Sequence, residues 1–401
     1  MWVQMRHQLA ALVAAVLFAQ IGVFFLYATT SCQLPLHSDD PSISSSTSSS
    51  TTVASTSELR ALVVSDIHLL GKRRRSWIER AWIDWQVKVT AYSAVQVHQP
   101  DLVLVLGDQF DEGGLPTPQS DWEEYVARFK HAFASFNPLK TLYLVGNHDT
   151  AFGRHMDMKE IRRYESAFGP SNYIEYIDSH AFVVINTMAL DSDVMNEDVK
   201  AQATDAALSD SFLNSVDTDE LRARTANGSV VLLTHLPLFR ADDMHCGDAR
   251  ARESGHVTYE HPSFPYAPHH HVLSQQLTNA LLTKFDPQVV LSGHTHAWCA
   301  STQRHWNGAQ EFTIPAFSWG QRPDPSYALL GLRRQERGPR RSDHQDHLVE
   351  AASVVLCSVP SEHSIFALYI VIAGVLVLVN LRRRCIKWNG RKIRLASNKD
   401  A

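Results

Sequence analysis

Five apolar runs, far apart in this chain, each end at a residue that can bind a metal ion. The candidate ligands offer oxygen or imidazole nitrogen and include no cysteine, which suits a hard or borderline divalent cation better than structural zinc. The set consists of Asp66, His68, Asp108, Asn147, His235, His294 and His296. These residues are numerous enough to hold two ions, and two ions that bracket a phosphate are suited to hydrolysis.

The apolar runs alternate with segments of helical spacing. Length and composition predict β-strands over residues 59–64, 102–106, 141–145, 182–185, 230–233, 289–291 and 312–314. Helices are predicted over residues 77–98 and 121–136. This alternation predicts an α/β fold, most simply two sheets packed face to face with helices outside. The candidate ligands follow predicted strands, where such folds gather functional groups.

Acidic residues follow the first two predicted strands. Asp66 and His68 lie two residues apart, so both side chains can point to one face and bind one ion; a surface turn is the alternative. Asp108 follows a buried strand and Gly107, and a metal ion gives a reason to place a charge there. The two oxygens of Asp108 can bridge two ions, with Asp111 as a supporting group. The alternative is that Asp108 and Asp111 only cap the start of a helix.

The tetrapeptide Gly-Asn-His-Asp at residues 146–149 follows the third predicted strand. Asn147 offers a neutral amide oxygen to a metal ion. His148 is a candidate general acid, because the neighbouring Asp149 can orient its ring and raise its basicity. We therefore predict His148 and Asp149 as catalytic residues.

Histidines follow two further strands. His294 and His296, preceded by Gly293, can each reach a different ion of a close pair. A lone histidine such as His235 is more often a core residue, and only the presence of the other motifs favours its prediction as a ligand. The triplet at residues 269–271 is interpreted as solvated, or as lining a substrate cleft, rather than as a metal site.

Composition excludes some classes of partner. The chain has 401 residues, 44% of them hydrophobic, and a net charge of −5, which does not indicate binding to nucleic acid. Five cysteines are too few for a disulfide scaffold but are compatible with one or two bridges in a lumenal domain. Cys246 and Cys299 follow ligand-bearing strands and can pair, which the sequence alone leaves open.

Two long apolar segments indicate membrane anchoring. Residues 9–28 are predicted to span a bilayer as a signal anchor behind a short cytosolic segment, residues 1–8, and a cleaved signal peptide is the alternative. Residues 364–381 form a second predicted span, and the tail of residues 382–401 is basic. Because positive residues stay in the cytosol, the tail is predicted to be cytosolic and the domain between the spans lumenal.

Between the spans, composition divides the chain. Residues 29–57 are rich in serine and threonine and are predicted to form a flexible stalk, residues 58–332 a globular domain, and residues 333–363 a charged linker. Residues 191–224 are polar and acidic and are interpreted as an insertion beside the site. Asn227 begins an N-glycosylation acceptor in a predicted turn, so we expect a glycoprotein.

In the order D-x-H, G-D-x-x-D, G-N-H-D, H and G-H-x-H, these motifs resemble those of the calcineurin-like metallophosphoesterases over residues 59–326. The resemblance implies a two-sheet α/β sandwich and a hydrolase with a dinuclear centre. The first ion would be held by Asp66, His68, Asp108 and His296. The second would be held by Asp108, Asn147, His235 and His294. His148 would protonate the leaving oxygen.

The stretches GDQFDEG, VLSGHTHAWC and IPAFSWGQRPDPSYAL resemble the membrane-bound secretory-pathway branch of that family. This resemblance implies removal of ethanolamine-phosphate from the mannose of GPI anchors in the endoplasmic reticulum, the ER–Golgi intermediate compartment and the Golgi. Manganese is the implied metal, although the same ligands accept zinc or iron. GPI-anchored proteins and cargo receptors of ER exit are the implied partners. Leu236, where close relatives carry an aromatic residue, is a departure that bears on substrate fit.

Two other functions are compatible with these motifs. A lumenal phosphomonoesterase or nucleotide hydrolase would use the same centre on another substrate. A non-catalytic cargo adaptor would keep the fold and tolerate loss of ligands. The presence of all the predicted metal ligands argues against the adaptor.

Overall fold

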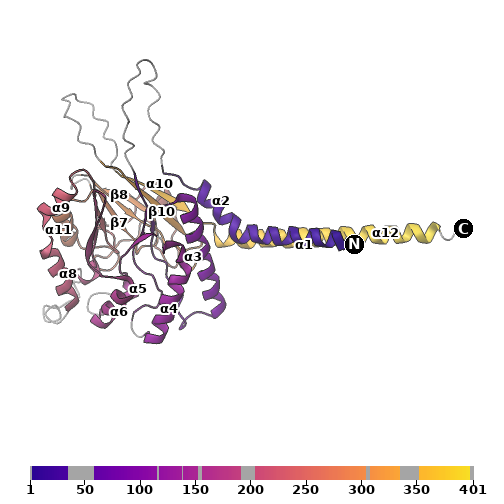
Figure 1. The fold of residues 1–401 in the computed structure, drawn as a ribbon, viewed down its shortest axis with the longest axis horizontal. Helices are drawn as coiled ribbons and strands as arrows, with labels where there is room; N and C mark the ends of the chain where they lie inside the picture. The colour runs from indigo at the N-terminus through magenta and orange to yellow at the C-terminus, as the bar shows by residue number, and fades with distance from the viewer. Residues whose placement is uncertain are drawn as a thin grey trace, which may run out of the picture.

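The computed structural model describes residues 2–34, 58–114, 117–137, 139–151, 156–190, 204–303, 308–334 and 352–397. Within these residues two β-sheets pack face to face, with helices on their outer faces (Figure 1). The first sheet has the order β11–β10–β1–β2–β3 and consists of β1 (Leu59–Val64), β2 (Leu102–Val105), β3 (Lys140–Tyr143), β10 (Ser326–Leu332) and β11 (Ala352–Ser358). The second has the order β4–β5–β6–β7–β9–β8 and consists of β4 (Tyr173–Ile177), β5 (His180–Val184), β6 (Val230–Leu233), β7 (Val289–Ser292), β8 (Cys299–Gln303) and β9 (Ala309–Thr313). The predicted α/β sandwich is confirmed.

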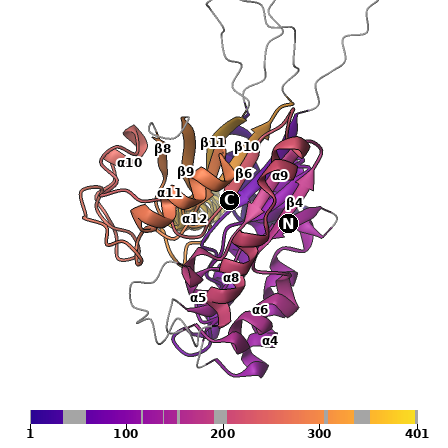
Figure 2. The ribbon, with the colours of Figure 1, turned by 90° about the vertical axis from the view of Figure 1, so that its left-hand side faces the viewer.

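Helices cover both outer faces. Helices α3 (Trp77–His98) and α4 (Gln119–Ala132) lie on the first sheet (Figure 1). Helices α8 (Thr204–Ser215), α9 (Thr218–Arg224) and α11 (Gln275–Phe285) lie on the second (Figure 2). The remaining helical segments are α1 (Trp2–Leu17), η1 (Phe18–Gly22), α2 (Val23–Thr30), η2 (Ala134–Phe136), α5 (Asn147–Thr150), α6 (Met158–Phe168), η4 (Thr187–Ala189), α10 (Asp248–Ala251) and α12 (Glu362–Ser397). The predicted helix over residues 121–136 is therefore α4 followed by the short η2.

The layer between the sheets holds the strand ends in place. Strand periodicity sends Val63 into this layer and Val64 toward the helices. Val63 pairs in register with Leu104 of β2, and Leu233 of β6 and Leu291 of β7 enter the same layer from the opposite sheet. All are fully or almost fully buried. Truncation of one such leucine to alanine typically costs about 2–5 kcal/mol.

Helix α3 has well-defined ends. Ser76 caps its amino end, where the Ser76 hydroxyl accepts from the Glu79 amide at 3.3 Å and the Glu79 carboxylate accepts from the Ser76 amide at 2.8 Å. This capping box begins the helix at the residue that the sequence predicts. Gln99 ends it in a left-handed conformation with φ 46°.

Two terminal helices are long and apolar enough to cross a membrane. They cover Ala10–Thr30, 21 residues, and Glu362–Arg383, 22 residues, and they agree with the predicted spans over residues 9–28 and 364–381. Both leave the same end of the domain and run side by side (Figure 1). The first helix also reaches into the domain, because Phe24 is 1% exposed and packs against Trp85 and Trp319.

The predicted linker over residues 333–363 is wrong in part. Residues 352–358 form β11, which pairs with β10 along its whole length, for example Ala328 with Leu356. The folded domain therefore extends beyond residue 332. Strands β4, β8 and β10 were also absent from the sequence prediction. The predicted stalk lies mostly, and residues 191–203 of the predicted insertion lie entirely, outside the described residues.

Two disulfides join distant segments. Cys32, just after the first apolar helix, bonds to Cys357 of β11, whereas Cys385 in α12 is a free thiol. The bond therefore ties the amino-terminal helix to the first sheet. The second disulfide joins Cys246 to Cys299, the pairing that the sequence left open.

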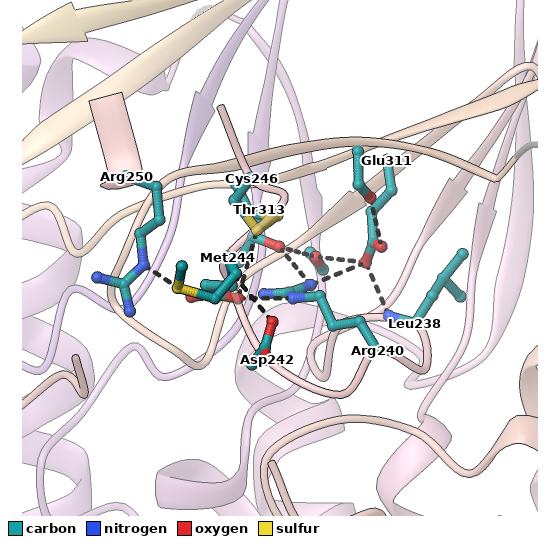
Figure 3. Close-up of a disulfide and its surroundings, with 12 residues drawn as sticks. Leu238, Arg240, Asp242, Met244, Cys246, Arg250, Glu311 and Thr313 are labelled. Atoms are coloured by element: carbon teal, nitrogen blue, oxygen red, sulfur yellow. Dashed lines mark hydrogen bonds and ion pairs between the residues drawn. A yellow bond between two sulfur atoms is a disulfide. The ribbon is translucent and has the colours of Figure 1, made fainter. Parts of the chain in front are cut away.

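The Cys246–Cys299 bond fixes the loop that follows β6 (Figure 3). In the same loop the Leu238 amide donates to the Glu311 carboxylate of β9 at 2.7 Å. The Arg240 guanidinium lies 3.7 Å from that carboxylate. The loop is thus attached at several points to β8 and β9, which stabilises the backbone just beyond His235.

Candidate metal centre

The predicted ligands converge at one edge of the sandwich. They come from the loops at the carboxyl ends of β1, β2, β3, β6 and β7. Asp66 is 0% exposed, and Asp108, His68 and His235 are each 1% exposed. Burying this many polar side chains together without a compensating charge is unfavourable, so the cluster indicates a ligand.

A first group of atoms surrounds a single point. His68 Nε2 lies 3.4 Å from Asp108 Oδ2, 3.2 Å from His296 Nε2 and 3.9 Å from Asp66 Oδ1. Asp66 Oδ1 lies 3.5 Å from His296 Nε2. Ligand atoms about 2.1 Å from a shared ion would be about 3–4 Å from their neighbours, so these distances fit one cation.

A second group shares the same oxygen of Asp108. His235 Nε2 lies 3.4 Å from Asp108 Oδ2 and 3.0 Å from Asn147 Oδ1. His294 Nδ1 lies 2.9 Å from the same Asn147 oxygen. The other Asp108 oxygen accepts from the His148 amide at 2.7 Å. Asp108 therefore faces both groups through Oδ2, whereas the sequence led us to expect bridging through both oxygens.

With both rings neutral, the histidines of the second group present acceptors that suit a cation. His235 Nδ1 lies 2.8 Å from the Leu106 carbonyl, to which it can only donate, so in the neutral ring Nε2 presents a lone pair. His294 Nε2 lies 2.7 Å from the His270 carbonyl, so Nδ1 presents a lone pair in the same way. Both lone pairs point at the Asn147 amide oxygen, which is an acceptor too. Three acceptors that face one point fit a bound metal ion.

Backbone conformation at these loops is unusual. Asp66, His68, Asp108, His294 and His296 all have positive φ, between 45° and 71°. Left-handed backbone is costly for residues other than glycine and is concentrated at functional sites. Five of the seven predicted ligands are therefore held in strained conformations that the surrounding sheets enforce.

Glycines permit the close approach of ligand loops. Gly107 has φ 99°, and a Cβ there would lie 2.5 Å from His235 Nδ1. At Gly146 a Cβ would collide with the Asp108 carboxylate. The glycine that precedes each of these ligand motifs is thus required by contact with a ligand from another strand.

His148 lies at the exposed side of the centre. Its Nδ1 donates to the Asp111 carbonyl at 3.0 Å, and its ring contacts that of His68 with the centroids 4.5 Å apart. Burial lowers the pKa of His148, but the negative charges of Asp108 and Asp111 outweigh burial, and the pKa is raised from its ordinary value. A partly exposed imidazole with Nδ1 fixed and a raised pKa can deliver a proton from Nε2.

Asp149 does not have the predicted role of orienting His148. Its buried carboxylate accepts from the backbone amides of Gly146 at 2.9 Å, Phe110 at 3.3 Å and Gln109 at 3.4 Å. These bonds join the loop after β2 to the loop after β3. Burial and the Asp108 carboxylate raise the pKa of Asp149 to about 8. Asp149 is thus a structural link between two ligand loops, and the Asp111 carbonyl orients His148. As the sequence suggested, Asp149 does contribute to raising the pKa of His148.

Charges within the cluster are divided unevenly. Burial lowers the pKa of His235, but the Asp108 carboxylate outweighs burial and raises it to about 9. Burial and the neighbouring His235 charge lower the pKa of His294 to about 3. Asp66 is lowered to a pKa of about 2, because the nearby His296 outweighs the effect of burial. These buried groups therefore attract positive charge to the space between them.

Sequence reasoning missed the backbone groups that orient the ligands. The carbonyls of Leu106, Asp111 and His270 fix the rings of His235, His148 and His294. The His270 carbonyl belongs to the histidine triplet of residues 269–271, which the sequence analysis interpreted as solvated. That interpretation did not predict the contact between this carbonyl and His294. Residue type carries no signal for a carbonyl contact, because every residue has one. The Asp111 side chain does support the centre, lying 3.7 Å from His68 Nδ1.

Comparison with known proteins identifies the family. The calcineurin-like phosphoesterase family model matches residues 59–298. Metallophosphoesterase 1 of Ailuropoda melanoleuca is 30% identical over 382 residues, covering 93% of this chain and 88% of that protein. Metallophosphoesterase 1 of Mus musculus is 30% identical over 332 residues, covering 80% and 77%. The chain belongs to the calcineurin-like phosphoesterase family.

Solved structures also resemble this chain. A dimetal phosphatase from Danio rerio aligns with a TM-score of 0.41 at 11% identity, covering 69% of this chain and 93% of that one. A purple acid phosphatase from yellow lupin seeds aligns with a TM-score of 0.43 at 13% identity, covering 78% and 55%. From the family match, the protein is a metal-dependent phosphoester hydrolase, and its ligand geometry is that of a site for two divalent ions.

Proposed function

We propose that this protein removes an ethanolamine-phosphate side group from the mannose of GPI anchors and so aids the ER-to-Golgi transport of GPI-anchored proteins. The observation that carries the proposal is the sharing of Asp108 Oδ2 by two complete ligand groups, beside a general acid, in a domain joined to two apolar helices. A phosphodiester is a substrate that two metal ions can hydrolyse, and a membrane-anchored glycan would be held near a site whose domain is itself joined to the membrane. Cargo receptors of ER exit are the proposed partners.

The proposed location is the lumen of the endoplasmic reticulum, the ER–Golgi intermediate compartment and the Golgi. Two disulfides support an oxidising compartment for the domain. The basic residues Arg382, Arg383 and Arg384 at the end of the second apolar segment support a cytosolic tail. Burial of Phe24 within the domain core supports a retained amino-terminal anchor, because cleavage after that residue would remove part of the core.

The residues of this chain divide the reaction between them. Asp66, His68, Asp108 and His296 would hold one ion, and Asp108 with Asn147, His235 and His294 would hold the other. When bound, two such ions polarise phosphate oxygens and make water nucleophilic near neutral pH.

Proton delivery falls to a side chain. His148, oriented by the Asp111 carbonyl, donates a proton from Nε2 to the departing sugar oxygen. Neutralising that oxygen as the P–O bond breaks makes it a better leaving group.

Manganese is the proposed metal, with zinc and iron as the competing choices. The ligand set of carboxylate, amide oxygen and imidazole, without thiolate, is compatible with all three. Metal analysis of the protein purified from its own secretory pathway would distinguish them, and a predominance of zinc or iron would contradict the choice of manganese.

The test uses the full-length protein in detergent with a GPI glycan that bears ethanolamine-phosphate. The expected result is manganese-dependent release of ethanolamine-phosphate, lost in Asp108→Ala and retained in Asp219→Ala, whose side chain is 92% exposed on α9. Hydrolysis of simple phosphomonoesters or nucleotides without release from the glycan would overturn the GPI assignment while leaving the metal chemistry intact. No hydrolysis of any substrate by folded, metal-loaded protein would favour an adaptor.

A further inference from the structure

Helix α3 carries an apolar stripe that the domain leaves partly exposed. Trp77 and Ile78 in its first turn are 71% and 61% exposed, and Tyr92 near its other end is 48% exposed. Trp82 and Trp85 lie between them at helical spacing and are half-buried. Exposed aromatic and aliphatic side chains beside half-buried tryptophans on one helix indicate an interaction surface.

The same stripe contacts the roots of both apolar terminal helices. Trp85 contacts Phe24 with ring centroids 5.7 Å apart, and Tyr92 contacts Phe25 at 5.9 Å. Trp82 stacks on Phe366 of α12 at 5.6 Å. Helix α3 therefore lies across the end of the domain from which the two helices project (Figure 1).

These contacts define the depth of α3 relative to a bilayer. The Trp82 indole donates to Glu362, the first residue of the second candidate span, at 2.8 Å. Tryptophan is enriched where a spanning helix leaves the hydrocarbon and enters the headgroup layer. Trp82 occupies that level, so the exposed Trp77 and Ile78 on the same helix lie near it as well.

A basic segment precedes α3. Arg73, Arg74 and Arg75 are exposed and lead directly to the Ser76 cap. Arg73 pairs with Glu112 at 3.1 Å and Arg75 reaches Glu79 at 3.7 Å. No acidic partner of Arg74 occurs among the described residues. Arginine beside an apolar stripe matches a lipid surface, where the stripe enters the interface and the guanidinium groups meet phosphates.

The basic segment is connected to the loop that carries Asp108. It follows His68 by a few residues along the chain, and Glu112, which pairs with Arg73, lies in the Asp108 loop. A contact that holds Arg73 in place therefore also helps to hold the loop that carries Asp108, because Arg73 pairs with Glu112 of that loop.

We propose that α3 lies flat on the bilayer that the terminal helices span, with Trp77 and Ile78 in the interface and Arg74 and Arg75 against lipid phosphates. The surface thereby sets the height and orientation of the metal centre above the membrane. A phosphoester attached to a lipid anchor would then meet the site at a defined distance from the bilayer. This inference rests on the two spans and on α3, and it does not require the proposed GPI substrate.

The test measures membrane depth directly. Full-length protein with Cys385→Ser, which removes the free thiol, receives a single cysteine at Ile78, labelled with an environment-sensitive fluorophore. The control places the same label at Ala280, exposed on α11 at the opposite edge of the domain (Figure 1). Both proteins are reconstituted in vesicles of phosphatidylcholine and phosphatidylserine that carry acyl-chain nitroxide quenchers.

The expected result is blue-shifted emission and severalfold stronger quenching at position 78 than at position 280. Arg74→Glu together with Arg75→Glu should reduce the quenching at position 78, whereas Arg334→Glu, at an exposed position beyond β10, should not. Equal, solvent-like emission at both positions would overturn the proposal. Shielding at position 78 that lipid-borne quenchers do not affect would assign the stripe to a protein contact instead and would also overturn it. Because no step measures hydrolysis, the result is independent of the proposed function.

Discussion

His235 Nε2 lies 3.0 Å from Asn147 Oδ1, and because His235 Nδ1 faces the Leu106 carbonyl, both atoms are acceptors whenever the His235 ring is neutral. In the metal-free protein a proton on His235, whose pKa is raised to about 9, supplies the positive charge that this pair of atoms needs. A metal ion would take the place of that proton, so metal binding should stabilise the protein and should weaken as the pH falls.

Metal removal should lower the melting temperature. A ligand at about 100 times its Kd stabilises the folded state by about 2.7 kcal/mol per site. We expect chelation of the full-length protein to lower its melting temperature and added manganese to restore it. Asn147→Ala should reduce the restoration, because one group loses its shared oxygen. A melting temperature that does not respond to metal would contradict the assignment of these residues as ligands.

His148→Ala should separate chemistry from metal binding. His148 contacts the centre from its exposed side, and its side chain is not among the atoms of either ligand group. We expect two ions per chain to remain and turnover to fall about 10²–10⁴-fold, the usual contribution of a general acid. Metal content and kcat, measured on the same preparation, check this prediction, and unchanged turnover would remove His148 from the mechanism.

Asp149→Ala should act through the loops instead of through proton transfer. Loss of a carboxylate that accepts three backbone amides loosens the segments bearing Asp108 and Asn147. Loss of a group that supports metal ligands typically lowers metal affinity about 10–100-fold. Titration of activity with metal should show this loss, with most of kcat recovered at saturation. A kcat that stays low at saturating metal, with unchanged affinity, would restore the catalytic role predicted from the sequence.

The stability of the β6–α10 region should depend on pH through Asp243. This buried carboxylate accepts from Arg240 at 2.7 Å, Arg250 at 2.7 Å and the Tyr266 hydroxyl at 2.6 Å. Burial alone raises the pKa of Asp243, but the two guanidinium groups outweigh it and the pKa is lowered. A lowered folded pKa contributes stability above the unfolded value of about 3.9, and that stability is lost as the pH falls through the folded pKa.

Asp243→Asn should consequently destabilise the protein near neutral pH by about 3 kcal/mol, because it removes the buried carboxylate that Arg240 and Arg250 share. The gap in melting temperature between variant and wild type should narrow below about pH 4. Asp242→Asn is the matched control, since its carboxylate accepts from the Met244 amide instead of from an arginine. A gap that is constant from neutral to acid pH would show that the Asp243 charge is not the source of the stability.

Apolar periodicity and motif order together predicted the ligand set from the sequence. Three of the strands that carry ligands, β2, β6 and β7, are buried on both faces, so their apolar runs are continuous and easy to recognise. Strand β4 is half-exposed along its length and has no such signal. Strand β11 follows a long charged stretch, and its pairing with β10 depends on tertiary contact across the sheet.

The details of the site were less accessible to sequence reasoning. Asp149 follows His148 directly, yet its side chain points into the protein, because residues one apart on the short helix α5 do not share a face. Asp108 Oδ1 accepts a hydrogen bond from the His148 amide, so that Oδ2 faces both ligand groups, and only folding places that amide there. Both features depend on where the backbone turns after each strand.

The most direct test of the account is the metal stoichiometry of Asp108→Ala. Asp108 Oδ2 lies 3.4 Å from both His68 Nε2 and His235 Nε2, so its removal takes one ligand from each ion. Elemental analysis of the purified full-length protein should give about two divalent ions per chain for wild type and for Asp219→Ala. Asp108→Ala should retain well under one, with hydrolysis of phosphodiesters lost in parallel. Two ions per chain in folded Asp108→Ala would contradict a shared dinuclear centre.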